Sequence, residues 1–460
     1  MPRRYLIETF GCQMNVHDSE RMAGLLEQAG YEATTEAVDA DVIVINTCSV
    51  REHAEEKLYT RLGELRVLRE ETGRDPIVAV AGCVAQQEGQ AILGRSREAD
   101  VILGTQAVRR LPLLIESAAA ARKPGRSTAE RGPIIDLQPQ DDVSFPLGVT
   151  RRHDPVKAYI TIIEGCNDCC AFCVVPYTRG AERMRAKRNI LDEIREAAAS
   201  GHREVQLLGQ IVNHYQAPDD PACDFAGLLE AVNGIAGIER IRFASPHPRH
   251  VTPRLIAAIR DLPKVCQHLH LPVQSGSTRV LQQMRRRYTR ERYLELVEEI
   301  RATVPGIALS TDMIVGFPGE TDADFEDTLS LTAAVGFHSM FSFKYSPRPR
   351  TLALKRMPDD VPEAEKTRRI VELQARQRDI QTAIHAQMVG TPVDVLIDSV
   401  SRRRDEELAG RTSGNTVVNV SGEPGWIGQI RRVRITRAGA FSLSGEALGE
   451  VDAAPAAAGA

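Results

Sequence analysis

The 460-residue chain has few aromatic residues, no long apolar run and no large excess of charge. Phe, Trp and Tyr make up 5% of the residues, which does not indicate a protein that stacks bases on an aromatic platform. No apolar stretch approaches the roughly 18 residues of a membrane span, and no signal-peptide core follows Met1-Pro-Arg-Arg. The net charge of −4 creates no overall field for nucleic acid, so such a partner would need local basic patches.

The length exceeds the roughly 250–300 residues at which a single core stops growing, so several domains are expected. Apolar residues (42%) and charged residues (26%) are in the ordinary range for globular proteins. Without a targeting or membrane segment, we expect a cytoplasmic protein. Its nine cysteines are then unlikely to form disulfides, and the odd number agrees with that. Metal binding or redox chemistry is the better explanation.

The first 118 residues alternate strand-like and helix-like segments. Continuous apolar runs at 4–10, 40–47, 75–82 and 99–105 predict buried parallel strands, and a helix is expected from residue 17 to a stop at Gly30, with Asp18 or Ser19 as its N-cap. We therefore predict a parallel α/β sheet domain over residues 1–118. The segment 119–150, rich in Ala, Pro, Gly and charge, is predicted to be a linker.

Three cysteines of this domain, Cys12, Cys48 and Cys83, lie at or just past the carboxyl ends of predicted strands. Ligands of open parallel sheets bind along that edge, so the three thiols are expected to converge. A single cysteine in such a place is usually a small buried apolar residue. Three in the same relative position favour a shared metal or cluster site.

Six strand–helix units follow over residues 151–388, with strands expected at 157–165, 204–210, 240–246, 268–274, 307–316 and 338–347. This number of units predicts a partial or complete (β/α) barrel, whose active site would lie at the carboxyl ends of its strands. Polar residues fall there, and each is a candidate for cofactor or substrate contact or for helix capping. They are Gln210, Asn213, Ser245, Gln274 and Asp312.

The first of these strands leads into the loop EGCNDCCAFCVVPYTRG, in which Cys166, Cys170 and Cys173 have the spacing C-x3-C-x2-C. A structural zinc site is disfavoured, because the two possible C-x2-C pairs abut and leave no chain to wrap the ion. Three thiolates on a four-iron cluster would leave one iron open for another ligand. Cys169 is expected to be a buried bystander, and Cys223 and Cys266 to be structural.

Residues 389–450 alternate apolar and polar positions between turn signals, which predicts a small antiparallel β-barrel of OB-like type. Several arginines in this otherwise acidic protein indicate RNA phosphate binding. The candidates are Arg402, Arg403, Arg404, Arg411, Arg431, Arg432, Arg434 and Arg437. Residues 451–460 (VDAAPAAAGA) lack core-forming content and are expected to be disordered.

Together, CNDCCAFC, VVPYTRGAER, GCQMNVHDSE, INTCSVRE, LLGQIVNHY, LHLPVQSGS, TDMIVGFPGET and FKYSPRPRT resemble the methylthiotransferases among radical S-adenosylmethionine enzymes. The resemblance covers nearly the whole chain. GCQMN is closest to the branch that acts on N6-dimethylallyladenosine in tRNA. The family's fold is a parallel-sheet domain, a partial (β/α)6 barrel and a C-terminal TRAM domain.

The resemblance implies two [4Fe-4S] clusters, one on Cys166, Cys170 and Cys173 that cleaves S-adenosylmethionine, and one on Cys12, Cys48 and Cys83 that carries or donates sulfur. It also implies sulfur insertion and methylation at carbon 2 of the modified adenosine beside the anticodon. Gly316 would let the backbone approach the cofactor's adenine, and Arg179 and Arg183 are phosphate candidates. The sequence departs from the family pattern at Cys169, Met184, Ala186 and Arg350.

The resemblance further implies two partners, a small electron-transfer protein of flavodoxin or ferredoxin type and a sulfur donor. We expect the chain to be a monomer that does not associate with membranes. Two alternatives stay open within the class, methylthiolation of threonylcarbamoyl-adenosine and methylthiolation of a ribosomal protein side chain. Outside the class, the alternative is a non-catalytic RNA-binding protein stabilised by metal.

Overall fold

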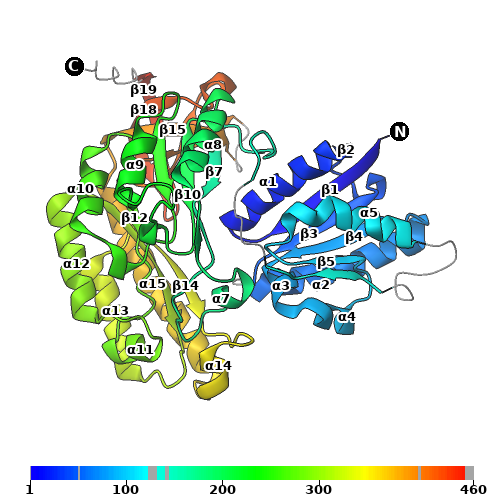
Figure 1. The fold of residues 1–460 in the computed structure, drawn as a ribbon. Coiled ribbons are helices and arrows are strands. Elements are labelled where there is room, and N and C mark those ends of the chain that lie inside the picture. The colour runs from blue at the N-terminus through cyan, green and yellow to red at the C-terminus, as the bar shows by residue number, and fades with distance from the viewer. Residues whose placement is uncertain (1, 50–51, 123–131, 140–144, 402–405, 451–460) are drawn as a thin grey trace.

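The computed structural model describes residues 2–49, 52–122, 132–139, 145–401 and 406–450. Figure 1 shows an N-terminal domain beside a larger central domain, with the C-terminal strands packed at one end of the central domain. The predicted disordered tail, residues 451–460, lies outside the described residues. None of the helices in the described part of the chain combines the length and apolar character needed to cross a bilayer.

The N-terminal domain is a six-stranded parallel sheet in the order β2-β1-β3-β4-β5-β6. Helices cover both faces of the sheet, as expected for strands that are apolar throughout. The strands are β1 (Arg3–Phe10), β2 (Tyr31–Ala33), β3 (Val42–Thr47), β4 (Ile77–Gly82), β5 (Val101–Leu103) and β6 (Ile134–Asp136). The helices are α1 (Gln13–Gln28), α2 (Glu52–Thr72), α3 (Cys83–Glu88), α4 (Ile92–Arg95) and α5 (Leu111–Ala121).

Two features of this domain differ from the prediction. Strand β6 lies inside the predicted linker and pairs with β5. It was missed because its two isoleucines stand among the Gly, Pro and charged residues that indicate a linker. Helix α1 begins at Gln13 with Cys12 as its N-cap, so Asp18 is an interior residue rather than a cap. The interior position turns Asp18 toward the central domain, where it becomes a buried ion-pair partner.

The central domain contains the six predicted strand–helix units. Its strands form two three-stranded parallel sheets, β11-β10-β7 and β12-β13-β14, joined by a single bridge between Ile241 and Val265. The strands are β7 (Lys157–Thr161), β10 (Glu204–Leu208), β11 (Arg240–Phe243), β12 (His268–His270), β13 (Ala308–Val315) and β14 (Ser339–Lys344). The outer helices are α8 (Lys187–Ala199), α9 (Phe225–Asn233), α10 (Pro253–Asp261), α11 (Thr278–Gln283), α12 (Arg290–Thr303) and α13 (Asp322–Val335). The predicted partial barrel is confirmed.

Short elements frame the cysteine loop of the central domain. Strand β8 (Ile163–Glu164) precedes the loop and pairs with β9 (Arg183–Met184), which follows it. Helix α7 (Val175–Thr178) lies inside the loop and packs against α3 of the N-terminal domain. Helix α14 (Leu352–Arg356) follows the last barrel strand, β14. It is bonded to the loop, since Ala353 N donates to Ala171 O at 2.8 Å.

A long helix, α15 (Glu363–Gln387), leads to the predicted small barrel. Its closed strand order is β15-β16-β17-β19-β18, and the pair β17–β19 is parallel whereas the others are antiparallel. The strands are β15 (Pro392–Val400), β16 (Glu407–Thr412), β17 (Val417–Ser421), β18 (Ile430–Ala438) and β19 (Leu443–Glu450). Closure leaves no exposed sheet edge.

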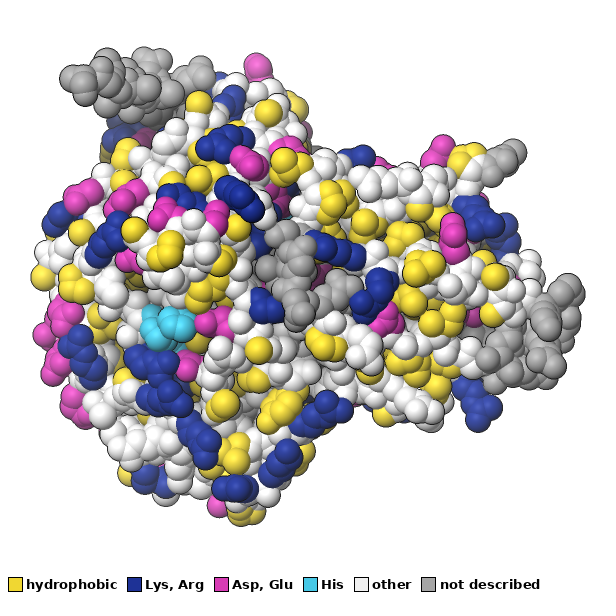
Figure 2. Space-filling view, viewed as in Figure 1, with side chains coloured by type: hydrophobic (Ala, Val, Ile, Leu, Met, Phe, Trp, Pro, Cys, Tyr) yellow, Lys and Arg dark blue, Asp and Glu magenta, His cyan; other side chains and the backbone are white. Residues whose placement is uncertain are grey.

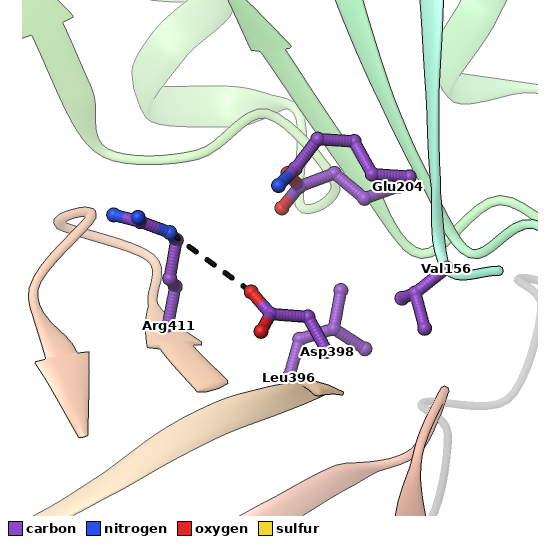
Figure 3. A pocket seen from close by; sticks show the side chains of 6 residues that line it. Val156, Glu204, Leu396, Asp398 and Arg411 are labelled. Carbon is purple, nitrogen blue, oxygen red and sulfur yellow. Dashed lines mark ion pairs between the residues drawn. The ribbon is translucent and has the colours of Figure 1, made fainter. Parts of the chain in front are cut away.

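The small barrel covers the amino-terminal end of the large one. Arg242 Nη1 and Nη2 donate to the carbonyls of Ser413 and Thr412 at 3.0 and 2.6 Å, and Gln267 N donates to Ser413 Oγ at 2.8 Å. Figure 3 shows the shallow pocket left between the two barrels, with Glu204 on one wall and Arg411 and Asp398 on the other. The carboxyl ends of the strands, at the opposite end, are left for the cysteines.

Glycine at position 24 allows helix α1 to pack closely on the chain that enters the barrel. A Cβ at Gly24 would lie 1.4 Å from the carbonyl oxygen of Val149. Gly63, in the middle of α2, has no atom within 4 Å of such a Cβ. The two glycines therefore form a matched pair, one required by packing and one not.

We expect Gly24→Ala to lower the free energy of unfolding by about 1–3 kcal/mol, because the methyl group overlaps backbone that cannot rotate away. Gly63→Ala should raise it by about 0.5–1 kcal/mol through the higher helix propensity of alanine. Chemical denaturation followed by circular dichroism measures both. Equal stability of the two variants would contradict the close packing of α1.

Candidate active site

The three N-terminal cysteines lie together at one edge of the sheet. Strands β1, β3 and β4 are parallel neighbours, with Phe10 opposite Thr47 and Thr47 opposite Gly82. Cys48 and Cys83 directly follow β3 and β4, and Cys12 lies two residues past β1. Gly82 (φ 90°) is required, because a Cβ there would lie 2.3 Å from Asn46 Oδ1. The structure thus brings the predicted triad together.

The environment of this triad favours a thiolate at Cys12. A hydrogen bond with Cys48, followed by the charge of Arg179, lowers the pKa of Cys12 to about 6. Burial raises the pKa of Cys83, and the Arg179 charge opposes that shift. Asn15 Oδ1 lies 3.3 Å from Cys12 Sγ, and its own Nδ2 donates to Asn46 Oδ1 at 3.1 Å. Thiolates are the form that binds metal.

The loop triad forms a second group of three. Burial raises the pKa of both Cys166 and Cys173 to about 12, and the charge of Cys170 adds to each shift. Cys173 N donates to Cys170 O at 3.1 Å, which folds the loop into a turn at these positions. Gly165 (φ 81°) lets the loop fold back, because a Cβ there would lie 2.0 Å from Ala181 O. Cys166 N then donates to Gly180 O at 3.1 Å.

Cys169 departs from the prediction. It is exposed rather than buried, and its Sγ contacts only the carbonyl of Asn167, at 3.8 Å, among the hydrogen bonds of the described residues. The neighbouring Asn167 and Asp168 keep the chain at the surface at this point of the loop. The prediction that Cys169 is buried was therefore wrong. Cys223 and Cys266 are buried, as structural cysteines would be.

Arg286 is a functional candidate that the sequence did not single out. Its side chain is buried, and Nη1 lies 3.5 Å from Cys170 Sγ while Nη2 donates to Pro272 O at 3.0 Å. Nε donates to Tyr288 Oη at 3.0 Å, so the guanidinium is held on three sides. Arg286 therefore places a fixed positive charge beside one cysteine of the loop triad. The local signal was the run of three arginines before Tyr288.

Arg179 connects the two cysteine groups. It is 4% exposed and its Nη2 donates to Asp18 Oδ2 at 2.7 Å. Interactions with Asp18, Cys83 and Cys12 raise the pKa of Arg179 against the effect of burial. Its carbonyl accepts from Gln106 Nε2 at 2.8 Å. Arg179 is therefore engaged within the protein, and it does not offer the RNA phosphate contact that we expected of it.

Other buried charges line the same interface. Arg21 Nη1 lies 3.6 Å from Glu164 Oε1, and His17 Nδ1 lies 2.8 Å from Thr161 Oγ1. Arg183, another predicted phosphate contact, pairs with Glu164 at 3.4 Å and is partly buried. The first two pairs fix the N-terminal domain against the β7–β8 end of the barrel, and the third holds β9 against β8 within the central domain.

The polar residues predicted at the strand ends have varied partners. Asn213 and His247 exchange two hydrogen bonds of 3.0 and 2.8 Å, and Gln210 Nε2 contacts Met14 Sδ at 2.6 Å. Asp312 Oδ1 lies 3.3 Å from His270 Nε2. Of these residues, Gln210 reaches the N-terminal domain and Asn213 joins two loops. Asp312 lies within β13 rather than at its end and pairs with His270 of the neighbouring strand β12.

Backbone strain marks two of the remaining positions. Ser245 (φ 62°) and Gln274 (φ 79°) are both in the left-handed region, which favours glycine, and such strain is characteristic of functional loops. Gly316 (φ 70°) has a packing reason of its own, since a Cβ there would lie 2.4 Å from Lys366 Cγ. The close approach at Gly316 is thus made by α15.

The arginines of the small barrel differ in availability. Arg432 and Arg434 are exposed on the outer face of β18, with Arg432 Nη1 2.8 Å from Asp394 Oδ1. Arg431 lies 4.5 Å over the ring of Trp426. Arg411 faces the pocket of Figure 3, 3.9 Å from Asp398. Arg402, Arg403 and Arg404 lie outside the described residues.

The donor sets of the two triads suit iron–sulfur clusters. Each offers three thiols, a fixed cation and a half-buried setting, and thiolates are the ligands such clusters prefer. Within the described residues, no three His, Cys, Asp or Glu side chains are grouped closely enough to hold one metal ion. The three thiolates of a four-iron cluster lie farther apart than the ligands of a single metal ion, because each thiolate binds its own iron.

Three family models match the chain. They are "Uncharacterized protein family UPF0004" over residues 4–104, "Radical SAM superfamily" over 160–332 and "TRAM domain" over 386–448. Among solved structures, the radical S-adenosylmethionine methyltransferase TsrM from Kitasatospora setae has a TM-score of 0.55 at 15% identity, covering 77% of this chain and 74% of that one. The cobalamin-dependent radical enzyme OxsB gives 0.52 at 14% identity, covering 82% and 62%. These likenesses concern the fold alone.

Curated relatives match over nearly the full length. A tRNA-2-methylthio-N(6)-dimethylallyladenosine synthase of Moorella thermoacetica is 45% identical, covering 96% of this chain and 98% of that protein. One of Geobacter metallireducens is 46% identical, covering 96% and 97%. The identity and the near-complete coverage of both chains show the family. The chain belongs to the tRNA-2-methylthio-N(6)-dimethylallyladenosine synthase family of radical S-adenosylmethionine enzymes.

Proposed function

We propose that this chain is a tRNA methylthiotransferase, which inserts sulfur at carbon 2 of N6-dimethylallyladenosine beside the anticodon and methylates it. The observation that carries the proposal is that the loop of Cys166, Cys170 and Cys173 also carries the buried Arg179, which pairs with Asp18 and interacts with Cys12 and Cys83 of the other triad. Family membership and the TRAM match support the same reaction and a tRNA substrate. An aromatic C–H bond is beyond side-chain acids and bases, so a cofactor has to perform that step.

Cys166, Cys170 and Cys173 would hold one [4Fe-4S] cluster, and Cys12, Cys48 and Cys83 a second. When bound, the first supplies the electron for reductive cleavage of S-adenosylmethionine, and the second supplies or carries sulfur. Arg286 would place a fixed positive charge beside one of the three cluster ligands, since its Nη1 lies 3.5 Å from Cys170 Sγ. Arg179 and Asn15 orient the second triad.

The barrel opening would receive S-adenosylmethionine and the adenosine. Gln210, Asn213, Ser245, Gln274, Asp312 and Gly316 are the contacts we propose there, with the left-handed backbone at Ser245 and Gln274 as support. The N-terminal domain helps to cover the opening, since Gln13 Oε1 accepts from Gln206 Nε2 at 3.2 Å. Covering excludes water, which strengthens electrostatic interactions inside.

We further propose a cytoplasmic monomer that draws electrons from a small flavodoxin or ferredoxin-type protein and sulfur from a separate donor. Nine cysteines without disulfides support a reducing compartment. The domain limits we propose are the predicted 1–118, 151–388 and 389–450, with α5 and β6 added to the N-terminal domain, because β6 pairs with β5 of its sheet.

Replacing Cys166, Cys170 and Cys173 together with Ala should remove one cluster. We expect about eight irons per chain in the wild type after anaerobic reconstitution and about four in the variant, because each triad holds four. Iron and acid-labile sulfide analysis measures this. Cys169→Ala is the matched control in the same loop and should keep the full content, and tightly bound zinc without iron would exclude the proposed enzyme.

Replacing Cys12, Cys48 and Cys83 with Ala should separate the two halves of the reaction. Reductive cleavage of S-adenosylmethionine should persist, because the loop triad is intact, whereas methylthiolated nucleoside should disappear. Chromatography of the cleavage products and of digested tRNA measures the two. Loss of cleavage as well would contradict the proposed division of labour.

Arg432→Gln combined with Arg434→Gln should weaken tRNA binding and flatten its salt dependence. Each lost phosphate contact lowers the slope of log K against log salt by about 0.7–0.9. The control variant, Arg260→Gln with Arg292→Gln, removes the same charge from the outer helices α10 and α12. Equal slopes in the two variants would place the RNA contacts outside β18.

A further inference from the structure

Five exposed cations surround the cysteine loop of the barrel domain. Arg285 and Arg287 follow helix α11, and Arg350, Lys355 and Arg356 lie in and before helix α14. Figure 2 shows a band of Lys and Arg side chains across the lower part of the barrel domain, where Figure 1 places α11 and α14. We call these five residues the basic rim.

Backbone hydrogen bonds attach both parts of the basic rim to the loop. Ala171, next to Cys170, donates from its N to Met284 O at 3.0 Å and accepts at its O from Ala353 N at 2.8 Å. Arg285 directly follows Met284, and Lys355 lies two residues after Ala353. The rim cations are therefore held on two sides of the cysteines.

A third side is occupied by Arg249, which donates to Asp168 Oδ1 at 2.9 Å. His247 lies between this arginine and the rim, because its ring packs edge-on against that of Tyr288 with centroids 5.7 Å apart, and Tyr288 directly follows Arg287. Arg249 comes two residues after His247, so Arg287 and Arg249 flank this ring contact. The positive charge continues from one side of the loop to the next.

Three of the five rim residues have an unfavourable backbone conformation. Arg285 (φ 60°), Arg287 (φ 58°) and Arg350 (φ 66°) all adopt the left-handed region, which is unfavourable for arginine. Between the first two, Arg286 is buried against Cys170 while its neighbours are exposed. Strain of this kind is found at functional sites. Among the described residues, none of the five rim cations has an ion-pair partner within 4.0 Å.

We propose that the basic rim binds the backbone phosphates of the substrate RNA, and so holds the anticodon loop at the mouth of the barrel. This inference rests on the proposed function and adds a binding site for the RNA phosphates near the cysteine loop. Exposed guanidinium groups without carboxylate partners are suited to phosphate.

The position of the small barrel supports this choice. It covers the amino-terminal ends of the barrel strands, so the arginines of β18 are attached at the end remote from the cysteine loop. RNA held by β18 alone would have no phosphate contact near the reacting base. Beside Arg249, His214 and His250 stack with ring centroids 4.4 Å apart, and partly exposed rings of this kind suit unpaired bases.

The test uses the reconstituted full-length protein and a labelled RNA hairpin of the anticodon stem–loop carrying N6-dimethylallyladenosine. Arg285→Asn with Arg287→Asn removes both charges, and Asn tolerates positive φ, so the loop keeps its conformation. We expect affinity at 0.1 M salt to fall on the order of tenfold or more, and the slope of log K against log salt to fall by about 1.4–1.8. Fluorescence anisotropy measures both.

Two control variants accompany it. Arg285→Lys with Arg287→Lys keeps the charge and should retain the wild-type salt slope. Arg260→Gln with Arg292→Gln removes two charges from the outer helices and should leave hairpin affinity within about twofold of wild type, because exposed charges beyond a Debye length are screened. Iron content reports whether each variant is folded.

An Asn variant that contains full iron and binds the hairpin with wild-type affinity and slope would overturn the inference, while the proposed function would stand. Unchanged RNA binding together with slower cluster reduction by a reduced flavodoxin would also overturn it, and would assign the rim to an acidic protein. If the wild-type protein itself failed to bind the hairpin, the proposed function would fall.

Discussion

The buried ion pair between Arg179 and Asp18 is the interaction on which the arrangement of this protein depends. Arg179 belongs to the loop that carries one cysteine triad, and Asp18 to the helix that follows Cys12 of the other. Each charge alone in this buried place would be costly, and removing one partner of a buried pair costs about 3–5 kcal/mol. The pair is satisfied only when the two domains are docked, so docking and alignment of the triads are coupled.

The two ends of the central barrel have different roles. At the amino-terminal end, Arg240 and Arg242 donate to carbonyls of the small barrel and close the opening with polar contacts. At the carboxyl end, the cysteine loop carries Arg179, which pairs with Asp18 of the N-terminal domain, and Gln210 contacts Met14 of the same domain. Stability and chemistry are therefore separated along the strands, as in complete (β/α) barrels.

Much of the fold was predictable because its elements are long and strongly periodic. The apolar strands β3 and β4 and the six strand–helix units all appear where expected. The missed strands β2 and β6 have three residues each and lack the longer apolar stretch that revealed the equally short β5. The start of α1 was misplaced because Asp18 and Ser19 are good N-caps, whereas the observed cap is Cys12.

By itself, the sequence determined the donor chemistry, since the number, type and spacing of the cysteines do not depend on the fold. It also determined which strand ends carry them. Only the tertiary structure decided which partner each arginine contacts, because the sequence does not distinguish one arginine side chain from another. Arg179 pairs with Asp18 inside the protein, Arg286 contacts Cys170, and Arg285 and Arg287 face solvent, although three of the four are consecutive. Burial and long-range contacts, which no local pattern encodes, made that distinction.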